Sequence, residues 1–551
     1  MWLGEVEEEP IEPFRCPESP NSTEMKILQD LVRDLNLTTP EALQNPGNET
    51  ASINIPGAFE VVELLAQNKH LHEMPFFHIL PSGEIGLCES WSKAVYSLEN
   101  VLRRTWWRRI WTAQEAFLPD RAMIHIGPHS IPYTTFLEAA NSWGHHVTSY
   151  SRSRWENCCL PILSLWMGYT PTLSPPAFFD RIEALKTLKD ARENLESGSV
   201  AHNLFLLAIQ RSATIRHDHV YGLFGLITEF FHLDEAPNYD LGLSRVYVMT
   251  TLKFMENAKH LCLLPYSRPH HREHNPDQNQ PFLNELPSWC PDWSDDAWRD
   301  YFDIYNYGGF TSDKMQFYNG ERQGDTILKL QGTLVGVVPV VAPLIRTMRV
   351  PPAEFVPTIQ AWLNLAESKG LQPQAVWEIV HVATHQDVGL EVVESQAAWW
   401  EMLKDLADND ATFQDMQDAA KQNSFLPCVA SMDWLDKRAV FLTEPISTLS
   451  DRAANPDEIS DYESAFPQGS IGLALPFVRE GDFIYIVKGG RTPFIFRPLS
   501  NASQRSKAKE AGIPEAELSN CFTLVGVCYI YGMMQGQALA ENPSWKQIYL
   551  L

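Results

Sequence analysis

Three tryptophans, a glutamine and a glutamate make the segment from Trp106 to Leu118, WWRRIWTAQEAFL, the best candidate for chemistry in this chain. A buried polar side chain needs a hydrogen-bond partner, and a buried unpaired carboxylate is costly. Gln114 and Glu115 therefore indicate either a functional site or a specific structural contact. The 3.6-residue period of a helix places the following side chains on one buried stripe, with Glu115 at its edge: Trp107, Ile110, Trp111, Gln114 and Leu118.

A second candidate is metal chemistry in the segment HHREH at residues 270–274, which matches the zinc-protease pattern H-x-x-E-H. That pattern needs a helix to bring both histidines onto one face. Pro269 and Pro276 flank the segment too closely for one. We therefore interpret the polar stretch from His270 to Gln280 as a solvated loop and expect no bound metal.

Other catalytic and nucleotide-binding motifs are missing from the sequence. It has no G-x-S-x-G elbow, no G-x-x-x-x-G-K-[ST] loop and no G-x-G-x-x-G after an expected strand. The pair Gly489-Gly490 is typical of a hairpin turn instead. We expect no bound cofactor.

The charge balance argues against nucleic acid as a partner. The chain has 69 Asp and Glu residues against 43 Lys and Arg residues, a formal net charge of −26, which repels phosphate backbones and anionic lipid. Arg103, Arg104, Arg108 and Arg109 alternate with tryptophans. This pattern is typical of a solvated helix face with buried indoles.

The cysteines and the apolar stretches indicate a soluble, cytoplasmic protein. The nine cysteines include no C-x-x-C pair, so we expect reduced and mostly buried thiols. The N-terminus shows no secretory signal. The longest apolar stretch, Leu330 to Ile345, is interrupted by two prolines and is shorter than the roughly 20 residues of a membrane helix, so we expect no transmembrane segment.

The elements around these residues can be predicted from periodicity and turn signals. In the first part of the chain we expect a helix from Thr105, as its cap, to Pro119, and a strand pair in 121–131 around Gly127. Asp218 is placed to cap a helix that starts at His219 and buries Tyr221. Further helices are expected at the following positions: 24–35, 59–68, from Ser90, 176–198 and 201–211.

The last part of the chain, from residue 326 onward, is predicted to be a β-rich unit. Residues 326–341 and 483–496 alternate or run apolar and predict twisted antiparallel strands, whereas 356–369 and 395–422 predict helices between them. We expect residues 469–551 to pack with 326–341 as one unit, because neither segment alone supplies a closed core. A chain of 551 residues exceeds the roughly 250–300 that one core serves, so at least two domains are expected.

Arg109, Trp111, Gln114 and Glu115 match the pattern R-x-W-T-x-Q-E, so the segment Trp106 to Leu118, called the signature segment below, resembles the end of the fungal heterokaryon-incompatibility (HET) domain. Four more patches resemble the family in the same order: 216–226, 286–294, 469–498 and 524–539. The resemblance implies a mainly structural role for the matching residues, namely Asp218, Tyr221, Gly225, Trp289, Pro291, Trp293, Gly481, Asp482, Gly490, Pro493, Arg497, Gly526, Tyr529, Gly532, Met534 and Gly536.

The start of the chain departs from the family pattern. Met1 to Gly4, MWLG, resembles a late strand of the HET domain, so that the family segments Ser-Tyr-x-Trp-Gly and Asp-x-x-Cys-Ile-Asn-Gln have no counterpart here. The resemblance therefore implies a mixed α+β chain in three parts. Residues 1–150 form the C-terminal portion of a HET-like α/β domain of the TIR type, 151–280 a helical region, and 281–551 a β-rich region with a helical insertion at about 350–425.

The resemblance implies a function in non-self recognition, heterokaryon incompatibility and programmed cell death. We expect association with other incompatibility proteins of the HET type, with a homo-oligomer as a further candidate. One alternative is an NAD-cleaving enzyme of the TIR type, in which Glu115 would steady a developing oxocarbenium charge. A third is a regulatory or non-functional remnant. We favour a structural role for Glu115, in which it and Gln114 bond backbone groups of a neighbouring loop.

Overall fold

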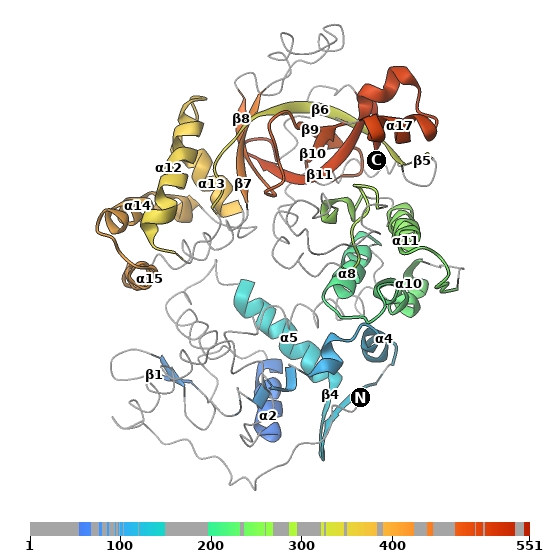
Figure 1. The fold of residues 1–551 in the computed structure, drawn as a ribbon. Helices are drawn as coiled ribbons and strands as arrows, with labels where there is room; N and C mark the ends of the chain where they lie inside the picture. The colour runs from blue at the N-terminus through green and yellow to red at the C-terminus, as the bar shows by residue number, and fades with distance from the viewer. Residues whose placement is uncertain are drawn as a thin grey trace. The chain divides into compact units, whose positions relative to one another are not determined.

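The structure is a computed structural model that divides the chain into two compact units, Met1–Pro237 and Asn238–Leu551 (Figure 1). The division lies inside the range 151–280, which the sequence analysis takes as one helical region. The structure describes residues 54–67, 77–79, 85–87, 94, 97–98, 100–102, 104–119, 121–148, 197–231, 236–258, 261–267, 286–294, 321–323, 327–345, 350–382, 390–423, 438–444, 469–490, 492–499, 502–534 and 545–551.

The first unit combines helices with two short antiparallel strand pairs, β1–β2 and β3–β4. Its described elements are α2 (Ile55–Ala66), β1 (Phe77–Ile79), β2 (Ile85–Leu87), η3 (Thr105–Arg108), α4 (Thr112–Phe117), β3 (Met123–Ile126), β4 (His129–Pro132), α5 (Tyr133–Thr148), α8 (Ser197–Ile209), α9 (Asp218–Tyr221) and α10 (Phe224–Phe231).

Two predicted elements of this unit are confirmed. The strand pair β3–β4 turns at Gly127, whose φ of 53° favours glycine, and it buries Ile124 and Ile126. Helix α2 starts four residues before the predicted Phe59, because the Asn54 side chain accepts a hydrogen bond of 2.9 Å from the Gly57 amide and caps the helix there.

The signature segment is not the continuous helix that the sequence predicts. It forms the short 3-10 helix η3, an extended residue at Arg109 and then the helix α4. Arg109 is extended because it pairs with Ser212, a residue distant in sequence. The interruption shifts the helical period, so Trp107 is buried at 2% exposure while Trp111 is 40% exposed. Thr105 is the first residue of η3 and not its cap.

The second unit is built on one large sheet with a helical layer. Its described elements are α11 (Leu243–Ala258), η5 (Leu264–Tyr266), β5 (Glu321–Gln323), β6 (Ile327–Val341), α12 (Pro352–Glu367), α13 (Pro373–Val382), α14 (Leu390–Asp408), α15 (Phe413–Gln422), β7 (Ala439–Glu444), β8 (Ser470–Ala474), β9 (Phe483–Val487), β10 (Phe494–Pro498), α17 (Ala502–Glu510), η12 (Glu515–Asn520), β11 (Cys521–Ile530) and β12 (Lys546–Leu550).

Six strands of this sheet close into a ring. The antiparallel pairs run β6–β9, β9–β10, β10–β11, β11–β8 and β8–β7, and β7 pairs back to β6. Strand β12 lies between β6 and β11, and β5 pairs with the start of β6. The prediction that 469–551 packs with 326–341 as one β-rich unit is confirmed.

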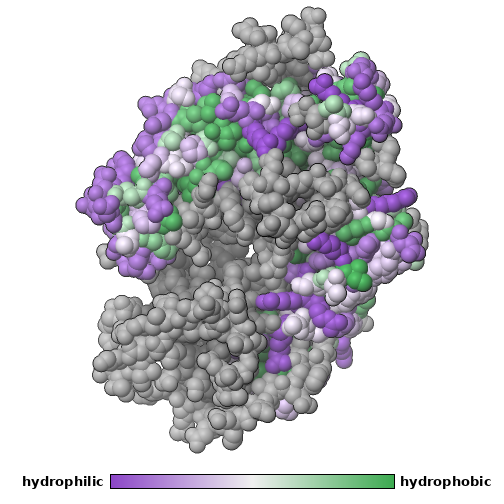
Figure 2. All heavy atoms as spheres, in the orientation of Figure 1, coloured by the Kyte–Doolittle hydropathy of each residue, from purple (hydrophilic) through white to green (hydrophobic). Residues whose placement is uncertain are grey.

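The ring strands separate two cores. Along β7, Ala439 and Phe441 belong to the core within the ring, whereas Val440 and Leu442 belong to the core beneath the helices. Successive strand residues point to opposite faces, so every residue of β8 is also buried. Helices α12 to α14 lie beside β7 and β8 (Figure 1), and hydrophobic side chains gather where this layer meets the strands (Figure 2).

The helical layer corresponds to the predicted insertion, with differences in detail. Helix α12 matches 356–369, but the stretch 395–422 is two helices, α14 and α15. They separate because Thr412 and Asp415 form a capping box that starts a new helix. Helix α13 was not predicted. Overall the chain mixes helices and strands, as the α+β assignment expects.

Several expectations lie outside the described residues. These are the strand at Met1 to Gly4, the helix at 24–35, most of the helix at 176–198, the loop from His270 to Gln280, and Gly536. Of the helix expected from Ser90, residues 94, 97–98 and 100–102 are described, and they are helical. In the part of the chain that is described, no helix is both long enough and apolar enough to cross a membrane.

Candidate functional site

The signature segment is bound to a second stretch of the first unit, residues 211–225, which we call the facing segment. Arg109 and Ser212 form a parallel β-bridge. The Ile110 amide donates to the Ser212 carbonyl at 3.1 Å, and the Ser212 amide donates to the Arg108 carbonyl. The bridge therefore joins the signature segment to the chain four residues before the patch 216–226 that also resembles the HET family.

A buried arginine, Arg211, donates hydrogen bonds to the signature segment at this junction. Arg211 is 4% exposed, and its Nη1 lies 3.1 Å from the Trp107 carbonyl oxygen, 3.2 Å from that of Arg109 and 3.1 Å from Thr112 Oγ1. Burial lowers the pKa of Arg211 to about 10, so the guanidinium stays charged at neutral pH. It donates to the turn between η3 and α4 and fixes that turn.

Gln114 bonds the backbone of the facing segment. Its Nε2 donates to the Gly222 carbonyl at 2.7 Å. Two glycines allow this approach: a Cβ on Gly222 would lie 2.8 Å from the Ile110 side chain, and one on Gly225 would lie 2.5 Å from Gln114 Oε1. Gly225 is one of the residues that the resemblance singles out, and the structure places it against the signature segment.

Trp111 and Asp218 form the second long-range contact. The Trp111 indole Nε1 donates to Asp218 Oδ2 at 3.2 Å. Asp218 was predicted to cap a helix starting at His219, and this is wrong. Helix α9 begins at Asp218 itself and has no side-chain cap, because the carboxylate faces the indole instead. Tyr221 is buried as predicted, and its ring stacks on that of His217 with the ring centroids 6.0 Å apart.

Glu115 occupies a different environment from Gln114. Its side chain is exposed, and Oε2 accepts a hydrogen bond of 3.2 Å from the indole of Trp106. Among the described residues, Glu115 makes no hydrogen bond to the backbone of the facing segment, so only Gln114 of the pair makes the predicted kind of contact. The indole N–H groups of Trp106 and Trp111 therefore both donate to carboxylates.

The tryptophans at 289 and 293 anchor a turn in the second unit. Trp293 Nε1 donates to Thr251 Oγ1 at 3.0 Å, and the Trp289 carbonyl accepts from Ser267 Oγ at 2.6 Å. Both indoles and Pro291 are buried. This patch serves packing against α11 and η5.

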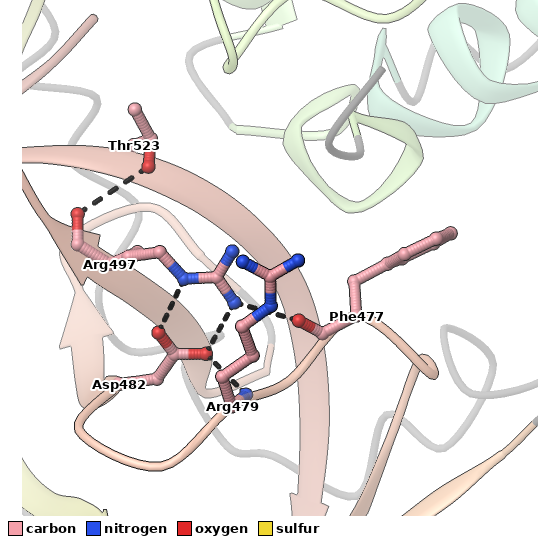
Figure 3. Close-up of polar contacts among 5 residues, drawn as sticks. All are labelled: Phe477, Arg479, Asp482, Arg497 and Thr523. Atoms are coloured by element: carbon pink, nitrogen blue, oxygen red, sulfur yellow. Dashed lines mark hydrogen bonds and ion pairs between the residues drawn. The ribbon is translucent and has the colours of Figure 1, made fainter. Parts of the chain in front are cut away.

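Asp482 and Arg497 form a partly buried ion pair in the ring (Figure 3). Arg497 donates through Nε to Oδ1 at 2.8 Å and through Nη2 to Oδ2 at 2.9 Å. It also donates to the Phe477 carbonyl at 2.7 Å, and Asp482 accepts from the Arg479 amide at 2.8 Å. The pair fixes the turn before β9, in which Gly481 has a φ of 87°.

The other residues of the second unit that match the HET-like pattern lie at turns and at contacts between strands. Tyr529 donates to Glu378 Oε1 at 2.8 Å and thereby ties β11 to α13. The Pro493 carbonyl accepts from the Cys528 amide at 3.0 Å, and Met534 is buried beneath the helical layer. Three glycines stand where the backbone has a positive φ or where a Cβ would contact a neighbouring side chain: Gly490, Gly526 and Gly532.

Two residues at the junction were not singled out from the sequence, although Thr112 stands at the threonine position of the pattern R-x-W-T-x-Q-E. Arg211 and Thr112 belong to no catalytic pattern, and each acts on backbone groups. An arginine at the end of the apolar helix 201–211 was the available signal. Among the described residues, no group of three His, Cys, Asp or Glu side chains is placed to hold a metal ion.

Comparison with known proteins adds no family to this geometry. No family model, curated protein or solved structure matches the chain.

Proposed function

We propose that this chain acts in non-self recognition of the heterokaryon-incompatibility type, leading to growth arrest or cell death, and that it acts by association with other proteins. The observation that carries the proposal is the contact between two HET-like motifs. Gln114 and Trp111 of the signature segment bond Gly222 and Asp218, which lie 108 and 107 residues further along the chain. Motif residues so distant in sequence form one structural unit.

The geometry favours association over turnover. Gln114 and Arg211 use their polar groups to hold backbone carbonyls, while Trp111 remains 40% exposed. Glu115, the candidate catalytic residue for NAD cleavage, is exposed and bonded to an indole. A carboxylate that stabilises a developing cation acts most strongly where water is excluded. The polar contacts thus hold the two segments together, while the exposed Trp111 is left on the surface for contact with another protein.

Induced expression of the full chain in a filamentous fungus tests this proposal. We expect growth arrest with the wild type and with Arg121→Ala, an exposed control in the same unit. Gly222→Val should abolish arrest, because its side chain would enter the space of Ile110 and separate the two motifs. Normal growth with the wild type at confirmed expression would refute the proposed function. Nicotinamide release by the purified chain would favour the enzyme alternative.

A further inference from the structure

An exposed surface of mixed chemistry covers the junction of the signature and facing segments. Trp111 is 40% and Ile215 is 50% exposed. Arg108 and Arg109 are also exposed, and within the described part of the chain neither guanidinium has a hydrogen-bond or ion-pair partner. We call these four residues the Arg-Trp surface.

The four residues belong to two segments, the signature segment and the facing segment, that are bonded to each other. The Arg109–Ser212 bridge joins the two segments at one point, and the bond from Trp111 to Asp218 joins them at another. Ile215 lies midway between Ser212 and Asp218 in sequence. Two arginines without partners among the described residues and two exposed apolar side chains are therefore carried by two segments that are fixed to each other.

The charge of this surface is opposite to that of the chain as a whole. The formal net charge is −26, yet Arg108 and Arg109 are adjacent exposed cations without partners among the described residues. The nearby carboxylates of Glu115 and Asp218 are bonded to the indoles of Trp106 and Trp111. An acidic ligand with an apolar side chain would complement both features.

We propose that the Arg-Trp surface binds an acidic protein segment that carries an aromatic or aliphatic anchor. The inference rests on the proposed function and names the chemistry of its partner. Tryptophan and arginine are the residues that most often dominate protein interfaces, because each combines a large contact area with a directed polar group. The anchor packs on Trp111 and Ile215, and carboxylates of the partner pair with Arg108 and Arg109. Nucleic acid fits less well, because two adjacent arginines are fewer cations than a run of regularly spaced phosphates needs.

Fluorescence anisotropy with the full chain tests this inference. The probe is a fluorescein-labelled peptide, Glu-Glu-Leu-Glu-Glu-Phe-Glu-Glu, and its control has glutamine in place of every glutamate. We expect the acidic probe to bind, with an affinity that falls as salt is raised. The double variant Arg108→Ala/Arg109→Ala should weaken binding by roughly tenfold or more, whereas Arg121→Ala should not change it.

The apolar half of the surface is tested separately. Ile215→Ser should weaken binding by roughly threefold to tenfold, because it removes anchor contact from an exposed side chain. Leu344→Ser, at a side chain that is 39% exposed in the second unit, should leave binding unchanged.

Each of three results would overturn the inference: no binding of the acidic probe, equal binding by the arginine variant and Arg121→Ala, or tighter binding of single-stranded DNA than of the peptide. The proposed function has its own readout. Growth arrest that persists in the arginine variant would show that the Arg-Trp surface is not needed for the proposed function. Absence of arrest with the wild type would instead refute the proposed function itself.

Discussion

Trp107 and Trp111 show how one residue of extended backbone redistributes burial. Trp107 packs against Phe136 with ring centroids 5.4 Å apart and donates to the Val101 carbonyl, whereas Trp111 is largely outside the core. We predict that Trp107→Ala lowers the free energy of unfolding by about 3–5 kcal/mol. Trp111→Ala should cost about 1 kcal/mol, mostly for the bond to Asp218. Equal midpoint shifts in a denaturant titration would contradict this assignment of the buried face.

Gln114 is predicted to stabilise the first unit through one backbone carbonyl. Gln114→Ala should cost about 1–3 kcal/mol in unfolding free energy, because the Gly222 carbonyl loses its side-chain donor. The matched control is Gln360→Ala, which removes an exposed bond to Asn364 within one helix and should cost less than about 0.5 kcal/mol. Both values come from urea unfolding followed by tryptophan fluorescence, and a control as costly as Gln114→Ala would argue against the contact.

At this scale the sequence identified the important pair but not its geometry. Gln114 and Glu115 could be singled out because polar side chains between indoles need an explanation. Their environments could not be predicted from the helical period. The period is broken at Arg109 by a bridge to Ser212, and pairing between residues so far apart has no local signal.

Among the elements, the ion pair of Asp482 and Arg497 is expected to hold the ring together. The side chains are 2% and 24% exposed, so Asp482→Ala leaves a poorly hydrated guanidinium and an uncapped turn. We predict a loss of about 3 kcal/mol. Lys509 and Glu515 form an exposed pair at 2.6 Å, and Lys509→Ala should cost less than about 0.5 kcal/mol. Similar losses in thermal or urea unfolding would mean that the partly buried pair of Asp482 and Arg497 does not support the ring.

The elements of the second unit were partly predictable. Strands β6 and β9 could be predicted because their apolar residues alternate or recur with little interruption and the two stretches are punctuated by glycines. The closure of six strands was not predictable. It depends on β7 and β8, which are short and buried on both faces, and a short apolar run does not distinguish a strand from a buried helix.

For the whole molecule, the contacts of the signature segment decide which fragments fold. A fragment of Met1 to Tyr150 lacks Arg211, Ser212 and Gly222, so Ile110 loses its contact with Gly222 and the Trp107 carbonyl loses its donor Arg211. We predict that it is aggregated or molten, whereas Met1 to Pro237 and Asn238 to Leu551 each unfold cooperatively. Circular dichroism melts and amide spectra check this. A well-dispersed spectrum from the shorter fragment would show that the facing segment is dispensable.

The measurement that tests the central claim most directly is growth arrest by Glu115→Gln at matched expression. The exposed side chain can keep its contact with the Trp106 indole through the amide oxygen, so stability should change by less than about 0.5 kcal/mol. Action by association predicts growth arrest equal to that of the wild type and no nicotinamide release from either protein. Loss of arrest by a folded Glu115→Gln protein would contradict the account and assign the activity to catalysis.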